Sequence, residues 1–277
     1  MRLLLALLFC FRLHSQEVTI LRQSGPAQSR INVVVLTDGY TTNQQAKALT
    51  DASAIFEAIR AGFGSDTNLI DGYACRRASA ESGADEPTKG VYRDTYYNSS
   101  FDSGYVGGMD RLLVIDYWGN LRAISDAANT ISTNVLAVVV VNSTRYGGSG
   151  GMTLVASVNG SSAEVARHEM GHTFAGLADE YCTAYPGWVQ REAPNSSTNQ
   201  IKPPWASITT NWIAGSQYNC TVWGRPFQEC RMKTLGRAWC AVCESHLAKV
   251  VRLKTGGAVP GRRTLTLRLS EQVPLNP

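Results

Sequence analysis

The sequence predicts an α/β fold, in which a twisted mixed sheet with helices is followed by an irregular, disulfide-rich C-terminal subdomain. Short aliphatic runs alternate with longer stretches that carry an apolar stripe at helical spacing. The aliphatic runs are nearly continuous, which is typical of strands buried on both faces. After Gly176 the composition shifts toward Pro, Trp, Asn, Ser and Cys, and periodicity is almost lost. We therefore expect one domain over residues 16–277, divided into subdomains 16–176 and 177–277.

The first fifteen residues have the features of a secretory signal peptide. Arg2 supplies an initial positive charge, and the apolar run 3–11 is too short to span a bilayer. We place the signal at residues 1–15 and expect a secreted or periplasmic protein. Without Arg2 and Arg12, 24 of the 26 Lys and Arg residues remain, compared with 22 acidic residues. This weak net charge and the lack of a basic stripe argue against nucleic-acid binding, and no later run is apolar enough to span a membrane.

Hydrophobic spacing predicts the elements before residue 161. The β-branched run 31–36 ends at Thr37-Asp38-Gly39, which indicates a buried strand and a turn. Residues 43–63 carry apolar side chains at helical spacing and predict a helix. The Gly-, Ser- and Asp-rich stretch 77–102 shows little periodicity and predicts a long surface excursion. Further strands are expected at 112–115, 135–141 and 152–158, a helix near 121–129, and a flexible loop at 142–151.

A third predicted helix begins near Ser162 and ends at Gly176. Ser161 and Glu164 have the three-residue spacing of a capping box. Gly176 can end the helix because glycine adopts the left-handed conformation at little cost. Beyond it, the sequence predicts a helix at 241–253 and a last strand, in which Leu265, Leu267 and Leu269 alternate with polar residues.

The helix that ends at Gly176 carries the segment His168-Glu169-Met170-Gly171-His172. Residues four apart lie on the same face of a helix, so His168 and His172 can bind one metal ion. Glu169 directly follows the first histidine, which is the spacing of the general base in zinc peptidases. The segment therefore predicts two imidazole ligands and one catalytic carboxylate.

The third ligand is expected soon after Gly176. A carboxylate would reduce the charge of the ion and leave a fourth position for water. Asp179 is the first candidate and Glu180 the second. Whichever of the two does not bind the metal is expected to hydrogen-bond a ligand imidazole. More remote candidates are Glu229, Glu244 and His246, the last of which is expected to pack in the core.

These residues predict a secreted endopeptidase with one catalytic zinc ion, which cleaves protein or peptide substrates. Zinc lowers the pKa of its bound water to about 7 and polarises the scissile carbonyl. Glu169 would take a proton from the zinc-bound water and deliver it to the leaving amine. Two alternatives remain: a non-catalytic secreted binding protein that retains the fold, and a zinc-dependent cell-wall amidase. Glu169 argues against the first, and the long Tyr/Gly-containing loop favours an extended polypeptide over a small amide.

Six cysteines follow the predicted signal. An even number in an exported chain favours three disulfides, whose pairing the sequence leaves open. The competing interpretation is a structural zinc site that combines Cys240-x-x-Cys243 with Cys220 and Cys230. The six cysteines are Cys75, Cys182, Cys220, Cys230, Cys240 and Cys243.

Residues 168–181, with the pattern His-Glu-x-Gly-His-x-Phe-Ala-Gly-Leu-Ala-Asp-Glu-Tyr, resemble the IgA-peptidase-like family of secreted bacterial zinc metallopeptidases. The similarity extends over most of the chain after the signal. Its other motifs are Val34-Val35-Leu36, Asp38-Gly39-Tyr40-Thr41, Glu81-Ser82-Gly83-Ala84-Asp85, residues 146–151, Arg225-Pro226, Cys230-Arg231-Met232 and Cys240-x-x-Cys243.

The resemblance implies a metzincin-like zinc endopeptidase domain. It makes Met232 the candidate for the methionine beneath the metal site of such folds. Residues 147–158 would form the loop and edge strand beside the cleft, where a substrate could add as an extra strand. The gap between the second histidine and Gly176 is one residue longer than in metzincins, which leaves the choice between Asp179 and Glu180 open.

Overall fold

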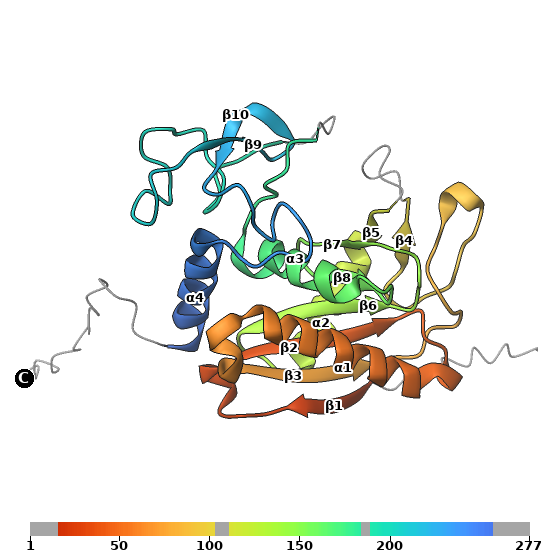
Figure 1. The fold of residues 1–277 in the computed structure, drawn as a ribbon. Helices are drawn as coiled ribbons and strands as arrows, with labels where there is room; N and C mark the ends of the chain where they lie inside the picture. The colour runs from red at the N-terminus through yellow and green to blue at the C-terminus, as the bar shows by residue number, and fades with distance from the viewer. Residues whose placement is uncertain (1–15, 103–110, 184–188, 257–277) are drawn as a thin grey trace, which may run out of the picture.

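The structure is a computed structural model that describes residues 16–102, 111–183 and 189–256. It has a mixed α/β fold built on a twisted six-stranded sheet of order β1-β3-β2-β6-β8-β7 (Figure 1). The four inner strands run parallel, and each edge strand runs antiparallel to its neighbour. The strands are β1 (Glu17–Arg22), β3 (Ile70–Arg76), β2 (Ile31–Asp38), β6 (Val135–Val141), β8 (Leu154–Ser157) and β7 (Gly148–Ser149).

The two central strands contain the aliphatic runs noted in the sequence. Every residue of β2 is buried, and so is every residue of β6 after Val135. Successive side chains of a strand point to opposite faces, so Val33 and Val34 enter different cores. The predicted strands at 31–36, 135–141 and 152–158 are confirmed. The predicted signal peptide and the strand around Leu265 lie outside the described residues.

Helices cover both faces of the sheet, as predicted. On one face α1 (Gln45–Gly62), α3 (Ser162–Ala175) and α4 (Ala241–Thr255) pack into one hydrophobic core. On the other face α2 (Tyr117–Thr130) packs over the second core. Both cores bury strand residues completely, which is the packing expected for parallel strands. The short 3-10 helices are η1 (Ala27–Ser29), η2 (Thr42–Gln44), η3 (Gly64–Leu69) and η4 (Pro87–Lys89).

The stretch 77–102 is more than a surface excursion, so that prediction is wrong in part. Tyr97 and Phe101 are fully buried in the second core. The carboxylate of Asp38, at the end of β2, accepts hydrogen bonds from the N–H groups of Tyr97 (2.8 Å) and Ser99 (3.2 Å). These bonds pull the segment onto the sheet, although its sequence lacks periodicity. There β4 (Ser99–Phe101) pairs with β5 (Leu113–Ile115) in a small antiparallel sheet.

The part after Gly176 is largely irregular, as predicted. It contains the hairpin of β9 (Ile213–Ser216) and β10 (Asn219–Arg225), and then α4, whose buried side chains join the core beneath α3. One disulfide, Cys182–Cys220, forms among the described residues. The expectation of three disulfides is therefore wrong for this structure, because Cys75, Cys230, Cys240 and Cys243 are buried free cysteines.

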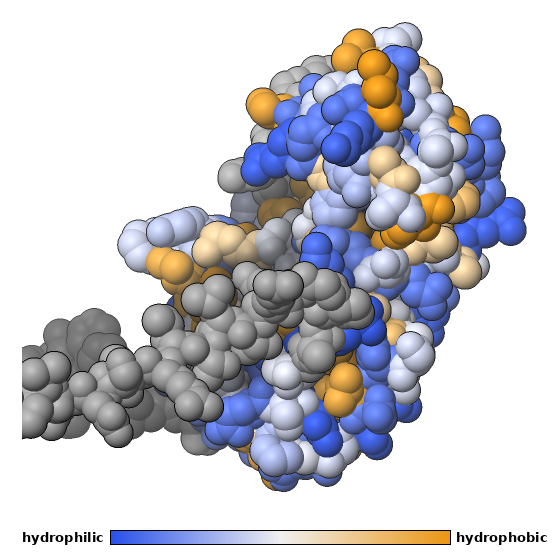
Figure 2. Space-filling view, turned by 90° about the vertical axis from the view of Figure 1, so that its left-hand side faces the viewer, coloured by the Kyte–Doolittle hydropathy of each residue, from blue (hydrophilic) through white to orange (hydrophobic). Residues whose placement is uncertain are grey.

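Among the described residues, no helix has the length and apolar character needed to cross a membrane. On the face drawn in Figure 2, hydrophobic residues form separate patches among hydrophilic ones and do not join into one band.

Candidate metal centre and active site

Helix α3 begins at Ser162 and ends at Ala175, as the sequence predicts, but its N-terminus is not the expected capping box. The Ser161 side chain makes no cap hydrogen bond. The carboxylate of Glu164 forms ion pairs with Arg167 and Arg231 instead. Two cations compete with a single backbone N–H for this carboxylate, and charge-assisted bonds are the stronger.

The C-terminal end of α3 turns the chain back toward the metal-binding face. Gly176 has φ of 61°, in the left-handed region that favours glycine. Its N–H donates to the carbonyl of His172, and the N–H of Leu177 donates to the carbonyl of Gly171, both at 3.0 Å. Asp179 follows two residues after Leu177, and its side chain faces the helix that the chain has just left.

Three side-chain atoms meet at this return. His168 Nε2 lies 3.0 Å from Asp179 Oδ1 and 3.2 Å from His172 Nε2. The third side of the triangle, from His172 Nε2 to Asp179 Oδ1, is 3.3 Å. Zinc binds nitrogen and oxygen at about 2.0–2.2 Å, so two donors of a tetrahedral site lie about 3.4 Å apart. The triangle is slightly tighter than this, and its donor types are those of a zinc site.

Glu169 lies beside the triangle and not in it. Its Oε2 is 4.0 Å from His172 Nε2, and its side chain is 14 % exposed. His172 is 21 % exposed, against 10 % for His168 and 7 % for Asp179. The three-atom cluster is therefore reached from solvent on the side of His172 and Glu169.

The family model for IgA peptidase M64 matches residues 19–213, which is well over half of the chain. The chain belongs to this peptidase family. A search of curated proteins finds no match. The family suggested by the sequence motifs is confirmed, and with it a metallopeptidase that acts on protein substrates. The matched M64 segment contains His168, Glu169, His172 and Asp179, whereas Met232 lies beyond its end.

Backbone carbonyls orient the two imidazoles of this M64 site. His168 Nδ1 is 3.0 Å from the carbonyl oxygen of Arg231, and His172 Nδ1 is 2.7 Å from that of Leu177. A carbonyl can only accept, so each Nδ1 donates a proton to it, and Nε2 is the nitrogen of each ring that faces the cluster. Neither carbonyl could be inferred from the sequence.

A tyrosine from the β9–β10 hairpin fixes the position of the Asp179 carboxylate. The hydroxyl of Tyr218 donates to Asp179 Oδ2 at 2.7 Å, and the hydroxyl of Tyr181 lies 3.1 Å from that of Tyr218. Gln217 and Tyr218 form the turn of the hairpin with φ of 49° and 62°. Such turns usually contain Asn or Gly, so the sequence carried no turn signal here and Tyr218 was not predicted.

Glu180 does not take part in this cluster. It is fully buried, and its Oε1 accepts from Asn195 Nδ2 at 2.9 Å. The expectation that the second carboxylate would hydrogen-bond a ligand imidazole is therefore wrong. The remote candidates are elsewhere too: Glu229 pairs with Lys233 and Arg237, Glu244 is exposed on α4, and His246 bonds the carbonyl of Ala175 from a half-buried position.

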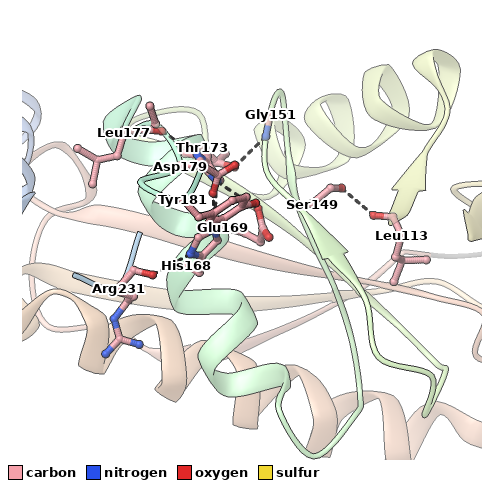
Figure 3. A network of polar contacts seen from close by, with 12 residues as sticks. Leu113, Ser149, Gly151, His168, Glu169, Thr173, Leu177, Asp179, Tyr181 and Arg231 are labelled. Atoms are coloured by element: carbon pink, nitrogen blue, oxygen red, sulfur yellow. Dashed lines mark hydrogen bonds and ion pairs between the residues drawn. The ribbon is translucent and has the colours of Figure 1, made fainter. Parts of the chain in front are cut away.

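Glycines let the β7 segment pass close over α3. A Cβ on Gly150 would lie 2.7 Å from the Cβ of His172 and 3.0 Å from Glu169 Oε2, so only glycine fits. The predicted loop and edge strand beside the site are thus present. The outer edge of β7 is partly covered, because Gly148 bridges Leu112 and Ser149 Oγ donates to the carbonyl of Leu113 (Figure 3). The covered edge does not favour strand addition at Gly148.

The charges of the cluster are coupled. Burial alone would lower the pKa of His172, but the Asp179 carboxylate outweighs it and raises the pKa to about 9. Burial alone would raise the pKa of Asp179, and the two histidines hold it well below its usual range. Burial raises the pKa of Glu169, and the histidines offset only part of this effect. The cluster favours a positive charge beside Asp179, which a metal ion also provides.

Met232 lies against the helical turn between the two histidines. It is fully buried, and a Cβ on Gly171 would come within 2.6 Å of its Sδ. This placement agrees with the role beneath the metal site that the family resemblance suggested for Met232.

Proposed function

We propose that this M64 peptidase is a secreted, zinc-dependent endopeptidase with a metzincin-like site. The observation that carries the proposal is the triangle of His168 Nε2, His172 Nε2 and Asp179 Oδ1, with Glu169 on its exposed side. Its three sides of 3.0, 3.2 and 3.3 Å match one face of a zinc tetrahedron. These three residues would hold the ion.

When bound, zinc would polarise the scissile carbonyl and lower the pKa of the attacking water. The residues of the chain prepare the rest of the reaction. Glu169 is placed to accept the proton of that water and to return it to the leaving amine. Its raised pKa brings it closer to the range in which a carboxylate can do both. Because each Nδ1 donates to a carbonyl, Nε2 is the nitrogen of each imidazole that would face the ion.

Secretion is the second part of the proposal. A signal over residues 1–15 would direct the chain out of the cytosol and into an oxidising compartment, in which disulfides persist. The Cys182–Cys220 disulfide fits an oxidising compartment. Outside the cell, the enzyme would meet unfolded or extended proteins.

The test is cleavage of an unstructured protein by the purified chain. We expect cleavage that a zinc chelator abolishes, and we expect Glu169→Gln to lower kcat by about 10²–10⁴ while zinc content and Tm stay unchanged. Glu57→Gln, at an exposed carboxylate of α1, is the matched control and should retain full activity. Undiminished cleavage by Glu169→Gln would contradict the assignment. Zinc binding without any cleavage would indicate a binding protein, and cleavage of wall peptides alone would indicate an amidase.

A further inference from the structure

A second group of potential ligands lies behind the first. Glu180, Cys230, Cys240 and Cys243 bring one carboxylate and three thiols together, and their ligand atoms all lie within 4.8 Å of one another. Cys240 is 8 % exposed, and the other three residues are fully buried. Glu180 comes from the segment after α3, Cys230 from the segment after β10, and the last two from the start of α4.

The distances in this cluster are those of metal ligands and not of a disulfide. Cys230 Sγ and Cys243 Sγ are 3.6 Å apart, and Cys243 Sγ is 3.5 Å from Glu180 Oε1. Zinc binds sulfur at about 2.3 Å and oxygen at about 2.1 Å, so tetrahedral ligands lie about 3.8 Å apart for two sulfurs and about 3.6 Å for sulfur and oxygen. A disulfide needs about 2.05 Å.

A cation would also balance a buried charge. Glu180 is fully buried, and its Oε2 has no hydrogen-bond partner among the described residues. Within residues 16–102, 111–183 and 189–256, no Lys or Arg makes an ion pair with Glu180. A disulfide between any two of the thiols would leave the third thiol and the carboxylate without a counter-charge. Burying an unpaired carboxylate is costly, whereas a metal ion satisfies all four groups.

The local backbone suits thiolate ligands. Cys240 is the N-cap of α4 and Cys243 lies in its first turn, where the helix dipole favours negative charge. The N–H of Cys240 donates to Cys230 Sγ at 3.3 Å. The Cys-x-x-Cys spacing is common in structural zinc sites.

We propose that Cys230, Cys240, Cys243 and Glu180 bind a second, structural zinc ion. Soft thiolates select zinc over magnesium or calcium. Four protein ligands leave no position for water, so this site would support the fold and not the chemistry. The competing zinc interpretation from the sequence is thereby revised, since Cys220 is in the disulfide and Glu180 takes its place.

This ion would connect the two segments that arrange the catalytic site. Glu180 follows Asp179 directly, and its N–H donates to the carbonyl of Met232 at 2.8 Å. Cys230 precedes Arg231, whose carbonyl orients His168. The structural ion would fix both backbone segments through Glu180 and Cys230. The residues next to these two, Asp179 and Arg231, contact the catalytic histidines.

Metal content separates this proposal from the proposed function. We expect two zinc equivalents in the purified chain and one in the His168→Ala/His172→Ala variant, which lacks the catalytic ligands. Replacement of that one ion by cobalt should give thiolate-to-cobalt charge-transfer absorption. Cys243→Ala should lose one equivalent and lower Tm, whereas the matched control Cys75→Ala, at a buried thiol in the other core, should keep both.

A second readout remains if Cys243→Ala does not fold. Alkylation of the unreduced, chelated and denatured chain should modify Cys75, Cys230, Cys240 and Cys243 and leave only Cys182 and Cys220 blocked. No zinc in the double-histidine variant, or a disulfide between any two of the three cluster cysteines, would overturn the proposal. Neither result would bear on cleavage by the wild-type chain.

Discussion

At the scale of single residues, hydrogen bonds behind the ligands decide which atoms face the metal. Asp179 offers Oδ1 to the histidines because Tyr218 occupies Oδ2. His168 and His172 present Nε2 because carbonyls accept from their Nδ1 atoms. Partners of this kind usually contribute a factor of 10–100 in metal affinity.

Tyr218→Phe should therefore weaken zinc binding at the catalytic site by about 10–100-fold and leave the fold intact. The ring remains, and only the O–H donated to Asp179 is lost. Tyr92→Phe is the matched control, because it removes the hydroxyl of an exposed tyrosine that takes no part in the site. Competition with a chromogenic chelator measures both variants, and an equal loss in both would show that the direct bond is not what matters.

Zinc binding to the stripped protein should release protons at neutral pH. The pKa of His172 is raised to about 9, so its imidazole carries a proton at pH 7 when no metal is bound. Zinc requires the neutral form, so the proton must leave. As pH falls below about 9, the Kd should rise about tenfold per pH unit, since one pKa unit corresponds to about 1.4 kcal/mol.

Calorimetric titration with zinc at pH 7, in two buffers of different ionisation enthalpy, counts the protons. We expect the release of at least about one proton. Binding heats that are the same in both buffers would contradict the coupling between His172 and Asp179.

The sequence was sufficient for His168, Glu169 and His172, because their spacing within one helix determines their geometry. It left Asp179 and Glu180 open, because both follow Gly176 closely and both are carboxylates. The structure separates them into two clusters on opposite sides of one segment. Tyr218 could not be predicted, since its contact joins residues 39 positions apart through a turn without a sequence signal.

At the scale of secondary structure elements, α3 is fitted closely against its surroundings at Gly171. A Cβ there would lie 2.6 Å from Met232 Sδ and 3.1 Å from the ring of Trp239. Alanine is the better helix former by about 1 kcal/mol. Overpacking of a filled core costs about 1–3 kcal/mol, so the clash should outweigh the helix propensity.

Gly171→Ala should accordingly lower the stability of the protein by about 1–2 kcal/mol and reduce activity, because the turn between the two histidines must shift. Gly160→Ala is the control, since nothing lies within 4 Å of its Cβ position. Urea denaturation measures the stability of both variants. Stabilisation by Gly171→Ala would mean that Met232 moves aside freely.

The elements themselves were predicted where the pattern is local. The aliphatic runs of β2 and β6 and the periodic stripe of α1 were sufficient. Strand β3 was missed because Asp71, Gly72 and Arg76 interrupt its apolar character, although all its residues are buried. Strand β1 was missed because it is an edge strand with Val18 and Ile20 exposed.

At the scale of the whole molecule, the irregular part after Gly176 shares one hydrophobic core with the sheet half and has one disulfide within it. Residues of α4 and Met232 belong to the same core as β2 and α1. The Cys182–Cys220 disulfide joins the segment after Tyr181 to the strand after Tyr218. The disulfide therefore lies close in sequence to the hydrogen bond between Tyr218 and Asp179, and both link the same two segments.

Removing this disulfide should affect stability and the metal site together. The bond spans 38 residues, and the chain-entropy relation gives about 4 kcal/mol for such a loop. Cys182→Ala/Cys220→Ala should lose stability of this order in urea denaturation. It should also bind the catalytic zinc more weakly, because the hairpin that presents Tyr218 loses its covalent link to the segment after Tyr181.

Each single variant, Cys182→Ala or Cys220→Ala, opens the same loop and should lose nearly as much stability as the pair. Adding Tyr218→Phe to the double variant then separates the two effects, since two changes that act through one contact are not additive. If the hairpin acts through Tyr218, this addition should lower zinc affinity much less than it does in the wild-type chain. A full additive loss would mean that the disulfide stabilises the fold without positioning the ligand.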